Sequence, residues 1–282
     1  MDTKIIDGRV LAQDIRLHLK EIIPTLPKKP VLAVVLIGDN PASKVYVEHK
    51  LKAAAEVGID VEFHHLSAVT DQQTAVQFVR DLNKQKDIDA ILLQLPLPAG
   101  LDSEAVLQEI DPAKDADGLH YVNLGKLFAG HPDILPCTPQ GCMALIKSVC
   151  PKLEGLNAVV IGRSNLVGRP LAQLLLDENC TVLQAHSKTK NLASLTCQAD
   201  ILVSATGQCH LVGKEFVKKG AVVIDVGITR DSNGRLCGDV DFNALQGWAG
   251  AVTPVPGGVG PMTIAMLLQN VVQIVQKKAC QE

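Results

Sequence analysis

The segment from Ala158 to Leu176 constrains the fold of this chain more than any other. An apolar run, Ala158-Val159-Val160-Ile161, ends at Gly162, and a helical pattern begins after Gly168. The run predicts a buried strand, and a glycine permits the sharp backbone turn that must follow it. The next helix offers free N–H groups and its positive dipole end to a phosphate. The segment therefore predicts a nucleotide-binding turn.

Ser164 stands where the usual G-x-G-x-x-G fingerprint has its middle glycine, so an ordinary strand-to-helix turn remains an alternative on this stretch alone. The rest of the chain favours nucleotide binding, because strand and helix patterns alternate throughout. Strands are expected near residues 31–37, 61–66, 88–93, 158–161, 181–185, 200–204 and 221–225. Thr70 and Thr138 are expected to cap the helices that follow them. The fold class is therefore α/β, with two domains, the second of them Rossmann-like. The C-terminal helix is expected to return to the first domain.

Composition narrows the class of protein. An apolar content of 47% with 20% charged residues is typical of a globular chain, and 282 residues suit two ordinary domains. The formal net charge of -3 and the absence of basic runs argue against a nucleic-acid partner. Because no apolar run approaches membrane-spanning length and the first residues lack a signal-like segment, we expect no membrane partner and a cytoplasmic protein.

The eight cysteines form no C-x-x-C motif and have no histidine at ligand spacing, so no metal site is expected. Most of them are interpreted as small, reduced core residues. His64 and His65 are neighbours on an expected strand and point to opposite faces, which favours a structural or solvated role.

Tyr46 and Lys50 are four residues apart on an expected helix, so their side chains share one face. No carboxylate occupies that face at helical spacing from Lys50, and lysine serves as an acid or base near neutrality only where its surroundings favour the neutral amine. A surface lysine beside a half-buried tyrosine is the alternative. Tyr-x-x-x-Lys also marks short-chain dehydrogenases, but there the glycine-rich turn precedes the tyrosine, and here the order is reversed.

Gln94 follows the expected strand at 88–93, at the carboxyl end where ligands bind in open α/β sheets. The strand after the glycine turn ends in His186-Ser187-Lys188, without the acidic residue that binds the ribose of NAD. Arg163 and Ser187 could instead bind a 2′-phosphate, which favours NADP, although both side chains could simply be solvated. Residues 253–261 are too rich in Pro and Gly for regular structure and could let backbone approach a planar ligand, or could form a plain connector.

These motifs together resemble the bifunctional methylenetetrahydrofolate dehydrogenase/cyclohydrolase family over nearly the whole chain. The matching motifs are Pro41-Ala42-Ser43 with Tyr46 and Lys50, Gln94-Leu95-Pro96-Leu97-Pro98, Lys114-Asp115-x-Asp117-Gly118, Gly162-Arg163-Ser164 with Val167-Gly168-Arg169-Pro170, and residues 253–261. The resemblance implies a folate-binding catalytic domain at residues 1–137 with 257–282, an NADP-binding domain at 138–256, and a homodimer formed through the latter.

The resemblance also implies two reactions of one-carbon metabolism, which supplies purine and amino-acid biosynthesis. These are NADP-dependent oxidation of 5,10-methylenetetrahydrofolate to the methenyl form and its hydrolysis to 10-formyltetrahydrofolate. Lys50 would be the acid/base, Gln94 its hydrogen-bond partner, Tyr46 would stack on or orient the folate, and Asp117 would bind the pterin. Further substrate contacts are expected at Leu93, Leu95, Pro256, Gly257, Gly258, Val259 and Gly260. NADP contacts are expected at Gly162, Arg163, Ser164, Val167, Gly168, Ser187 and Ile228.

Two other functions stay open at this point. Another two-domain NADP dehydrogenase, acting on a small hydroxy acid or a shikimate-like substrate, would bind no folate. A dinucleotide-binding regulator without catalysis would bind nucleotide without any turnover.

Overall fold

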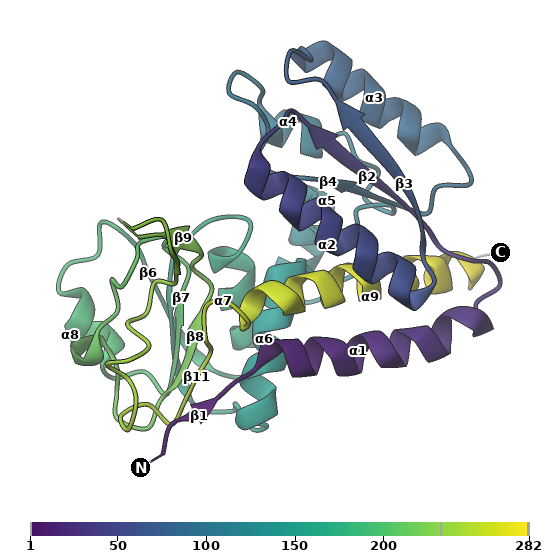
Figure 1. Ribbon diagram of the computed structural model, residues 1–282. Coiled ribbons are helices and arrows are strands. Elements are labelled where there is room, and N and C mark those ends of the chain that lie inside the picture. Colours follow the sequence, from purple (N-terminus) through teal and green to yellow (C-terminus); the bar gives the residue numbers. More distant parts are fainter. Residues whose placement is uncertain (1, 232, 281–282) are drawn as a thin grey trace. The chain divides into compact units, whose positions relative to one another are not determined.

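The computed structural model describes residues 2–231 and 233–280 and divides into two compact units. The six-stranded unit comprises Met1–Ala12 and Pro136–Thr263. The three-stranded unit comprises Gln13–Leu135 and Ile264–Glu282. Figure 1 labels the elements of both, and each unit is described by itself below. The expected α/β class and the two-domain organisation are confirmed, since each unit has its own parallel sheet.

The sheet of the six-stranded unit is entirely parallel. In spatial order its strands are β1 (Lys4–Ile5), β11 (Ala251–Val252), β8 (Val222–Asp225), β7 (Ile201–Ser204), β5 (Asn157–Ile161) and β6 (Thr181–Ala185). The chain leaves β5 for β6 on one side and then crosses to β7 on the other. This reversal makes the carboxyl ends of β5 and β7 the switch point at which such sheets bind ligands.

Both faces of this sheet are covered, as a parallel sheet requires. Helices α6 (Cys137–Val149) and α7 (Gly168–Asp177) lie on one face and the short α8 (Leu192–Thr196) on the other (Figure 1). Val159, Leu202 and Val223 point into a core that also contains Val217 and Leu245. The 3-10 turn η2 (Lys214–Phe216) and the hairpin of β9 (Thr229–Arg230) and β10 (Leu236–Cys237) complete the described part of this unit, together with the first residues of α1 (Gly8–Ile22).

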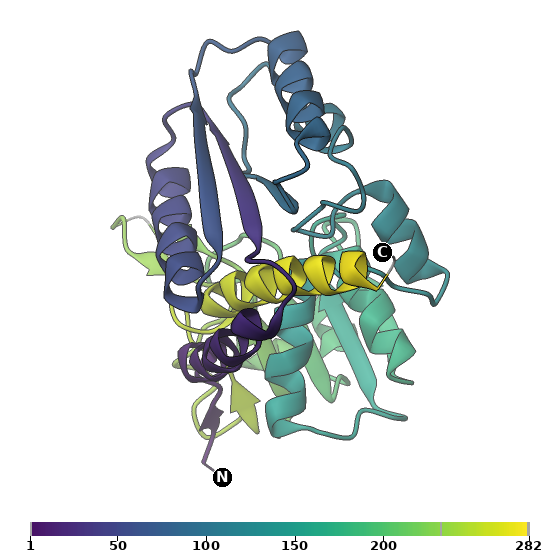
Figure 2. The ribbon, with the colours of Figure 1, turned by 90° about the vertical axis from the view of Figure 1, so that its right-hand side faces the viewer.

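The three-stranded unit has the strand order β3 (Asp60–Leu66), β2 (Val31–Ile37), β4 (Ala90–Leu93). The central strand β2 is apolar on both faces, and Figure 2 shows the strands between α2 (Pro41–Val57) and α3 (Gln72–Lys84). Ala33, Val35 and Ile37 pack against α3 and against α4 (Ser103–Leu107). The rest of α1, the turn η1 (Ile23–Thr25) and α5 (Tyr121–Phe128) also belong to this unit.

The last helix, α9 (Val259–Ala279), begins in the six-stranded unit and continues into the three-stranded one from Ile264, as expected. Its length and mean hydropathy reach those of a membrane span, but 67% of its most apolar window is buried inside the protein, as in a core helix. Asn270 is completely buried on it. The Asn270 amide donates to the carbonyl oxygens of Ala116 and Leu135, each at 2.9 Å, and so ties the helix to two loops of its unit.

Three local predictions were wrong. The cap of α3 is Asp71, not Thr70, because the Asp71 carboxylate accepts the Thr74 N–H at 2.7 Å and an anion also suits the helix dipole. Thr138 does not cap α6, which begins at Cys137; its hydroxyl instead lies 3.0 Å from that of Thr263. The Pro/Gly segment at 253–261 is not irregular to its end, since α9 already begins at Val259.

The cysteine interpretation holds in part. Cys137, Cys142 and Cys180 are buried and form no disulfide, whereas Cys197 and Cys280 are exposed. Cys209 and Cys237 form a disulfide, with their Cα atoms 5.8 Å apart. They are 28 residues apart in sequence, and no motif spacing signals the pairing, because only the fold brings the loop after β7 against β10.

Replacing Asn270 with alanine should destabilise the protein by about 2 to 4 kcal/mol, because the buried Ala116 carbonyl and the part-buried Leu135 carbonyl would lose this donor. Urea unfolding of Asn270→Ala measures the loss. The matched control is Gln269→Ala, the exposed neighbour on the same helix, which should change the free energy of unfolding by less than about 0.5 kcal/mol. Equal stability of the two variants would contradict the anchoring role.

Candidate active site

Lys50 and Gln94 form the polar centre of the three-stranded unit. Lys50 is only 7% exposed, and its Nζ donates to Gln94 Oε1 at 2.9 Å. Within the described part of the chain no carboxylate oxygen lies within 4.0 Å of that Nζ. The structure therefore shows the expected hydrogen bond and excludes the alternative of a surface lysine. A buried ammonium with only a neutral partner is costly, which is characteristic of a group that serves chemistry.

The orientation of the Gln94 amide is fixed from both sides. Its Nε2 donates to the carbonyl oxygen of Leu95 at 2.5 Å, so Oε1 must face Lys50. Gln94 itself is held where β4 ends, through a bond from its N–H to the Val35 carbonyl at 2.8 Å. Leu93, the last residue of β4, is buried, and Leu95 is half-buried. The strand end thus delivers an oriented amide acceptor to the amine.

Asp117 reaches the same end of the sheet through the turn at residues 114–118. Asp115 forms a parallel bridge with Ile91 of β4, so the two segments run in the same direction. Asp117 and Leu93 are each two residues beyond this bridge, and both therefore lie toward the carboxyl end of the sheet. The buried Asp115 carboxylate shapes the turn by accepting the N–H groups of Gly118 at 3.0 Å and His120 at 2.8 Å. Burial raises the pKa of Asp115. Asp117 is half-buried and accessible to a ligand.

Lys114 anchors the start of that turn. Its Nζ donates to the carbonyl oxygens of Asn83 at 2.8 Å and Gln85 at 2.7 Å, at the C-terminus of α3. Burial lowers the pKa of Lys114, with the charge of Lys278 adding to the effect. A cation is favourable at a helix C-terminus, so this lysine has a structural role beside the turn that carries Asp117.

Tyr46 and Ser43 lie on α2 before Lys50. Tyr46 is half-buried one helical turn away, and burial raises the pKa of its phenol. Ser43 is 3% exposed, and its Oγ has no hydrogen-bond partner. Ser43, Val47 and Lys50 are all buried, at positions i, i+4 and i+7 of one helix face. The sequence analysis did not assign Ser43 to the site, although its spacing from Lys50 was a usable signal.

At the carboxyl edge of the six-stranded sheet, the backbone approaches itself closely at the glycine turn. A Cβ on Gly162 would lie 2.6 Å from the Ala205 carbonyl oxygen, and one on Gly168 would lie 2.3 Å from the Gly162 oxygen. Gly162 also has a φ of +134°, which favours glycine. Ser164 Oγ accepts the N–H of Val167 at 3.2 Å. Glycine at 162 and 168 is therefore a packing requirement of the turn, and serine is tolerated between them.

Three further predicted cofactor residues lie after the ends of strands β5, β6 and β8. Arg163 is exposed, and its guanidinium forms no hydrogen bond or ion pair within residues 2–231 and 233–280. Ser187 is exposed two residues beyond β6, the neighbour of β5, and no acidic residue stands at that strand end. Ile228 is 46% exposed after β8. A free cation and a hydroxyl beside a glycine turn fit a dinucleotide with an additional phosphate.

Two buried carboxylates organise the loops at this edge. Asp239 accepts from the Ser204 hydroxyl at 2.9 Å and from the N–H groups of Thr206 at 2.6 Å and Gln208 at 2.9 Å. Asp225 accepts the N–H groups of Gly227, Asp239 and Val240. Burial, with the Asp239 charge adding, raises the pKa of Asp225 to about 7 although these N–H groups oppose the shift.

Residues 256–260 form the end of the Pro/Gly segment and the first turn of α9. The N–H of Gly8 donates to the Gly257 carbonyl at 2.9 Å, and a Cβ on Gly8 would lie 1.8 Å from the Gly258 oxygen. Pro256 is exposed, whereas Gly258 and Val259 are buried. The segment is thus a packed backbone surface of the six-stranded unit.

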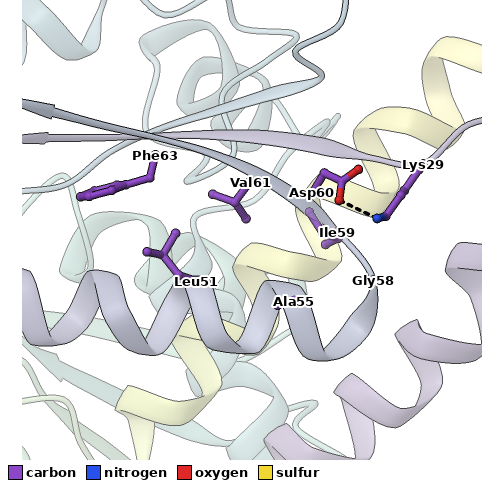
Figure 3. Close-up of a pocket in the computed structure, with 8 residues that line it drawn as sticks. All are labelled: Lys29, Leu51, Ala55, Gly58, Ile59, Asp60, Val61 and Phe63. Atoms are coloured by element: carbon purple, nitrogen blue, oxygen red, sulfur yellow. Dashed lines mark hydrogen bonds and ion pairs between the residues drawn. The ribbon is translucent and has the colours of Figure 1, made fainter.

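A hollow of about 460 Å³ lies between α2 and β3, on the flank that carries Leu51 and Ala55 (Figure 3). Its lining exposes polar and apolar surface in nearly equal amounts, with Val61 and Phe63 among the apolar side chains. The two charged groups at its end, Lys29 and Asp60, pair with each other at 2.5 Å. Since both charges are already paired, the hollow offers no catalytic group. Among the described residues, no cluster of three His, Cys, Asp or Glu side chains could hold a metal.

The fold and these residues define a two-domain α/β protein that has a dinucleotide-binding edge in one unit and a lysine-centred polar site in the other. Two family models identify it further. Residues 6–117 match the catalytic domain of tetrahydrofolate dehydrogenase/cyclohydrolase, and residues 136–279 match the NAD(P)-binding domain of the same family. The chain belongs to this family.

Full-length relatives agree with the family models. The bifunctional protein FolD of Streptococcus agalactiae is 49% identical over 275 residues, which cover 96% of this chain and 97% of the relative. That of Listeria innocua is 50% identical over 277 residues, with 97% and 98% covered. The resemblance inferred from the motifs is confirmed.

Solved structures give the same result. The bifunctional FolD dehydrogenase/cyclohydrolase of Campylobacter jejuni superposes with a TM-score of 0.95 at 43% identity, covering 98% of this chain and 99% of its own. The Trypanosoma brucei enzyme, solved with NADP cofactor and an inhibitor, has a TM-score of 0.94 at 38% identity, with 99% of both chains covered. A shikimate dehydrogenase from Aquifex aeolicus, at 11% identity and a TM-score of 0.53, shows the fold alone.

The raised pKa of Asp225 predicts a pH-dependent stability. The pKa of Asp225 is about 7 in the folded protein, against 3.8 for the ordinary group, so folding favours the protonated carboxyl. This contribution to stability is fully present below pH 3.8 and is lost as the pH rises through 7. Between pH 6 and 8 the loss should be about 1.4 kcal/mol.

The test compares free energies of unfolding across that pH range for the unmodified protein and Asp225→Asn, which cannot titrate there. Their difference should change by the predicted amount. Asp177→Asn, at an exposed site of the same unit, is the control and should follow the unmodified protein. Parallel pH profiles for the unmodified protein and Asp225→Asn would contradict the raised pKa.

Proposed function

We propose that this protein oxidises 5,10-methylenetetrahydrofolate to 5,10-methenyltetrahydrofolate with NADP and hydrolyses the product to 10-formyltetrahydrofolate. Membership of the dehydrogenase/cyclohydrolase family and near-complete coverage of the FolD relatives support both activities. The observation that carries the assignment to residues is the buried Lys50 amine, held by Gln94 and by no carboxylate in the described chain. This amine is the acid/base candidate of the protein.

Hydrolysis needs a single group that can both take and give a proton. Water adds to the carbon between the two folate nitrogens, and Lys50 takes the proton that the water loses. The bond from this carbon to N5 then breaks as Lys50 returns the proton to N5, and the hydroxyl proton leaves as the formyl C=O forms. One proton is released overall. Gln94 Oε1 orients the amine throughout by accepting its N–H.

The oxidation step depends mainly on positioning. Two nitrogens flank the reacting carbon and share the positive charge that develops there. NADP, when bound, supplies the hydride acceptor. In this chain the N-terminus of α7, which follows the Gly162 turn, would bind the pyrophosphate, and Arg163 and Ser187 would bind the 2′-phosphate.

Folate recognition completes the proposal. The Asp117 carboxylate would accept hydrogen bonds from the amino and ring N–H groups of the pterin, and Tyr46 would stack on or orient it. Leu93, Leu95 and residues 256–260 would contribute apolar and backbone contacts. Val167, Gly168 and Ile228 would contact the cofactor.

The proposal also covers the domain organisation, the oligomeric state and the cellular location of the protein. The proposed functional division is a folate-binding catalytic domain at residues 1–137 with 257–282 and an NADP-binding domain at 138–256; its bounds differ from those of the structural units, which group residues 2–12 and 257–263 with the six-stranded sheet. The protein would act in the cytoplasm as a homodimer formed through the latter. The dimer rests on the family resemblance, and sedimentation equilibrium tests it.

Lys50→Met should lower the cyclohydrolase rate by at least about 10²-fold, because the variant removes the proton carrier and keeps the apolar stem. NADP binding, measured by calorimetry, should be unchanged. Lys52→Met is the matched control, an exposed lysine two residues along the same helix, and should retain full activity. Undiminished hydrolysis by Lys50→Met would refute the assigned role.

Arg163→Ala should weaken NADP binding by about 10-fold or more while changing NAD binding little, because a guanidinium binds a 2′-phosphate that NAD lacks. Dissociation constants for the two nucleotides measure this. Lys152→Ala, which removes an exposed cation elsewhere in the six-stranded unit, should leave both constants unchanged. A parallel loss for NADP and NAD would assign Arg163 to the pyrophosphate instead.

A further inference from the structure

The loop after β7 is attached to the β9–β10 hairpin by a covalent bond as well as by hydrogen bonds. Cys209, five residues after the end of β7 at Ser204, forms a disulfide with Cys237 of β10. The next residue, His210, donates its N–H to the Gly238 carbonyl at 3.0 Å. Asp239 accepts the N–H groups of Thr206 and Gln208, as described above. The disulfide is therefore one of several links between the same two segments.

This loop borders the glycine turn directly. The Ala205 N–H donates to the Ile161 carbonyl at 2.8 Å, and a Cβ on Gly162 would lie 2.6 Å from the Ala205 oxygen. Both strands, β5 and β7, end here at the switch point of the sheet. A change in the order of residues 205–210 therefore acts on the surface that faces the cofactor.

The two sulfur atoms differ in access. Cys237 is 6% exposed, whereas Cys209 is half-buried at the surface of its loop. An external thiol can thus reach the Cys209 side of the bond first, with Cys237 as the leaving sulfur. This asymmetry suits a disulfide that opens and closes in the folded protein, because the remaining hydrogen bonds keep the two segments adjacent while residues 205–210 lose the covalent constraint on their order.

We propose that Cys209 and Cys237 form a reversible thiol–disulfide site which exchanges with small-molecule thiols and disulfides and sets the order of the cofactor loop. The inference rests on the assignment of the Gly162 turn to NADP binding. Disulfides of cytosolic proteins are commonly transient redox devices rather than permanent links, which agrees with this role.

The exchange balances without a metal or other oxidant. A thiolate attacks the Cys209 sulfur, the S–S bond breaks, and its electron pair goes to Cys237, which takes a proton. A second thiol then attacks the mixed disulfide and releases Cys209. The protein disulfide and two thiols give two protein thiols and one small-molecule disulfide, and the reverse reaction reoxidises the protein.

The test equilibrates the full-length protein in buffers of reduced and oxidised glutathione and maps the paired cysteines by differential alkylation and mass spectrometry. NADP dissociation constants are measured in parallel. The Cys209–Cys237 pair should open and close reversibly, and the reduced protein should bind NADP about three- to tenfold more weakly, because the loop must then be ordered on binding.

Three variants separate the outcomes. Cys209→Ser should bind NADP like the reduced protein at every glutathione ratio, whereas Cys197→Ser, at an exposed free cysteine, should respond like the unmodified protein. Three results would overturn the inference. The Cys209–Cys237 pair could be missing from the map, the NADP dissociation constant could be the same with the disulfide open and closed, or NADP binding by Cys209→Ser could still depend on the glutathione ratio. Arg163→Ala separates failure of the NADP assignment from failure of the redox site. If this variant binds NADP as the unmodified protein does, the assignment of the Gly162 turn fails. If it binds NADP more weakly and NADP binding does not depend on the glutathione ratio, only the redox site fails.

Discussion

The hydrogen bond between Lys50 and Gln94 is the interaction on which the functional account depends. A lysine that is 7% exposed and has no carboxylate within ion-pair distance in the described chain costs stability, because burial removes its amine from water and a neutral amide replaces only part of that solvation. The surrounding structure holds both partners firmly. Lys50 is on the inner face of a 17-residue helix, and Gln94 is fixed by a strand end and by the Leu95 carbonyl. The geometry thus presents an oriented amine rather than a mobile surface charge.

The six-stranded unit solves a different physical problem, the close approach of backbone to a charged ligand. Glycine at 162 and 168 removes the side chains that would collide with Ala205 and with the turn itself. The loops beyond the strands are then held by Asp225 and Asp239, whose carboxylates accept backbone N–H groups instead of binding ligand. The exposed Arg163 remains available to an anion. Stability and binding are thereby assigned to separate charged residues at one edge.

Much of this could be predicted from sequence, because the signals are local. The apolar run at 31–37 coincides with β2, and the strand expected at 181–185 coincides with β6. Lys50 and Gln94 were identified from helical spacing and a strand end, and the structure brings them together across 44 residues of sequence. The pairing itself followed from the family resemblance, since spacing alone left a surface lysine equally acceptable.

The sequence analysis missed features of two kinds. Some depend on residues that are far apart along the chain, and others on a choice between adjacent residues with similar chemistry. Ser43 shares a helix face with Lys50, a spacing that the sequence analysis did not use, and only the structure shows that its buried hydroxyl has no hydrogen-bond partner. Asp71 and Thr70 are both good caps, so local preference did not separate them. The Cys209–Cys237 pair depends on the return of β10 to the loop after β7, which no spacing rule describes. Helix α5 was not predicted at all.

The central claim, that one chain carries both folate activities, is tested most directly by an absorbance time course of the purified protein with 5,10-methylenetetrahydrofolate. Reduced cofactor and methenyl absorbance are followed together, with NADP and separately with NAD. The account predicts that reduced cofactor rises with NADP, faster than with NAD, while little methenyl compound accumulates. No reduction with either nucleotide would contradict the dehydrogenase assignment, and stoichiometric accumulation of the methenyl compound would contradict the cyclohydrolase assignment.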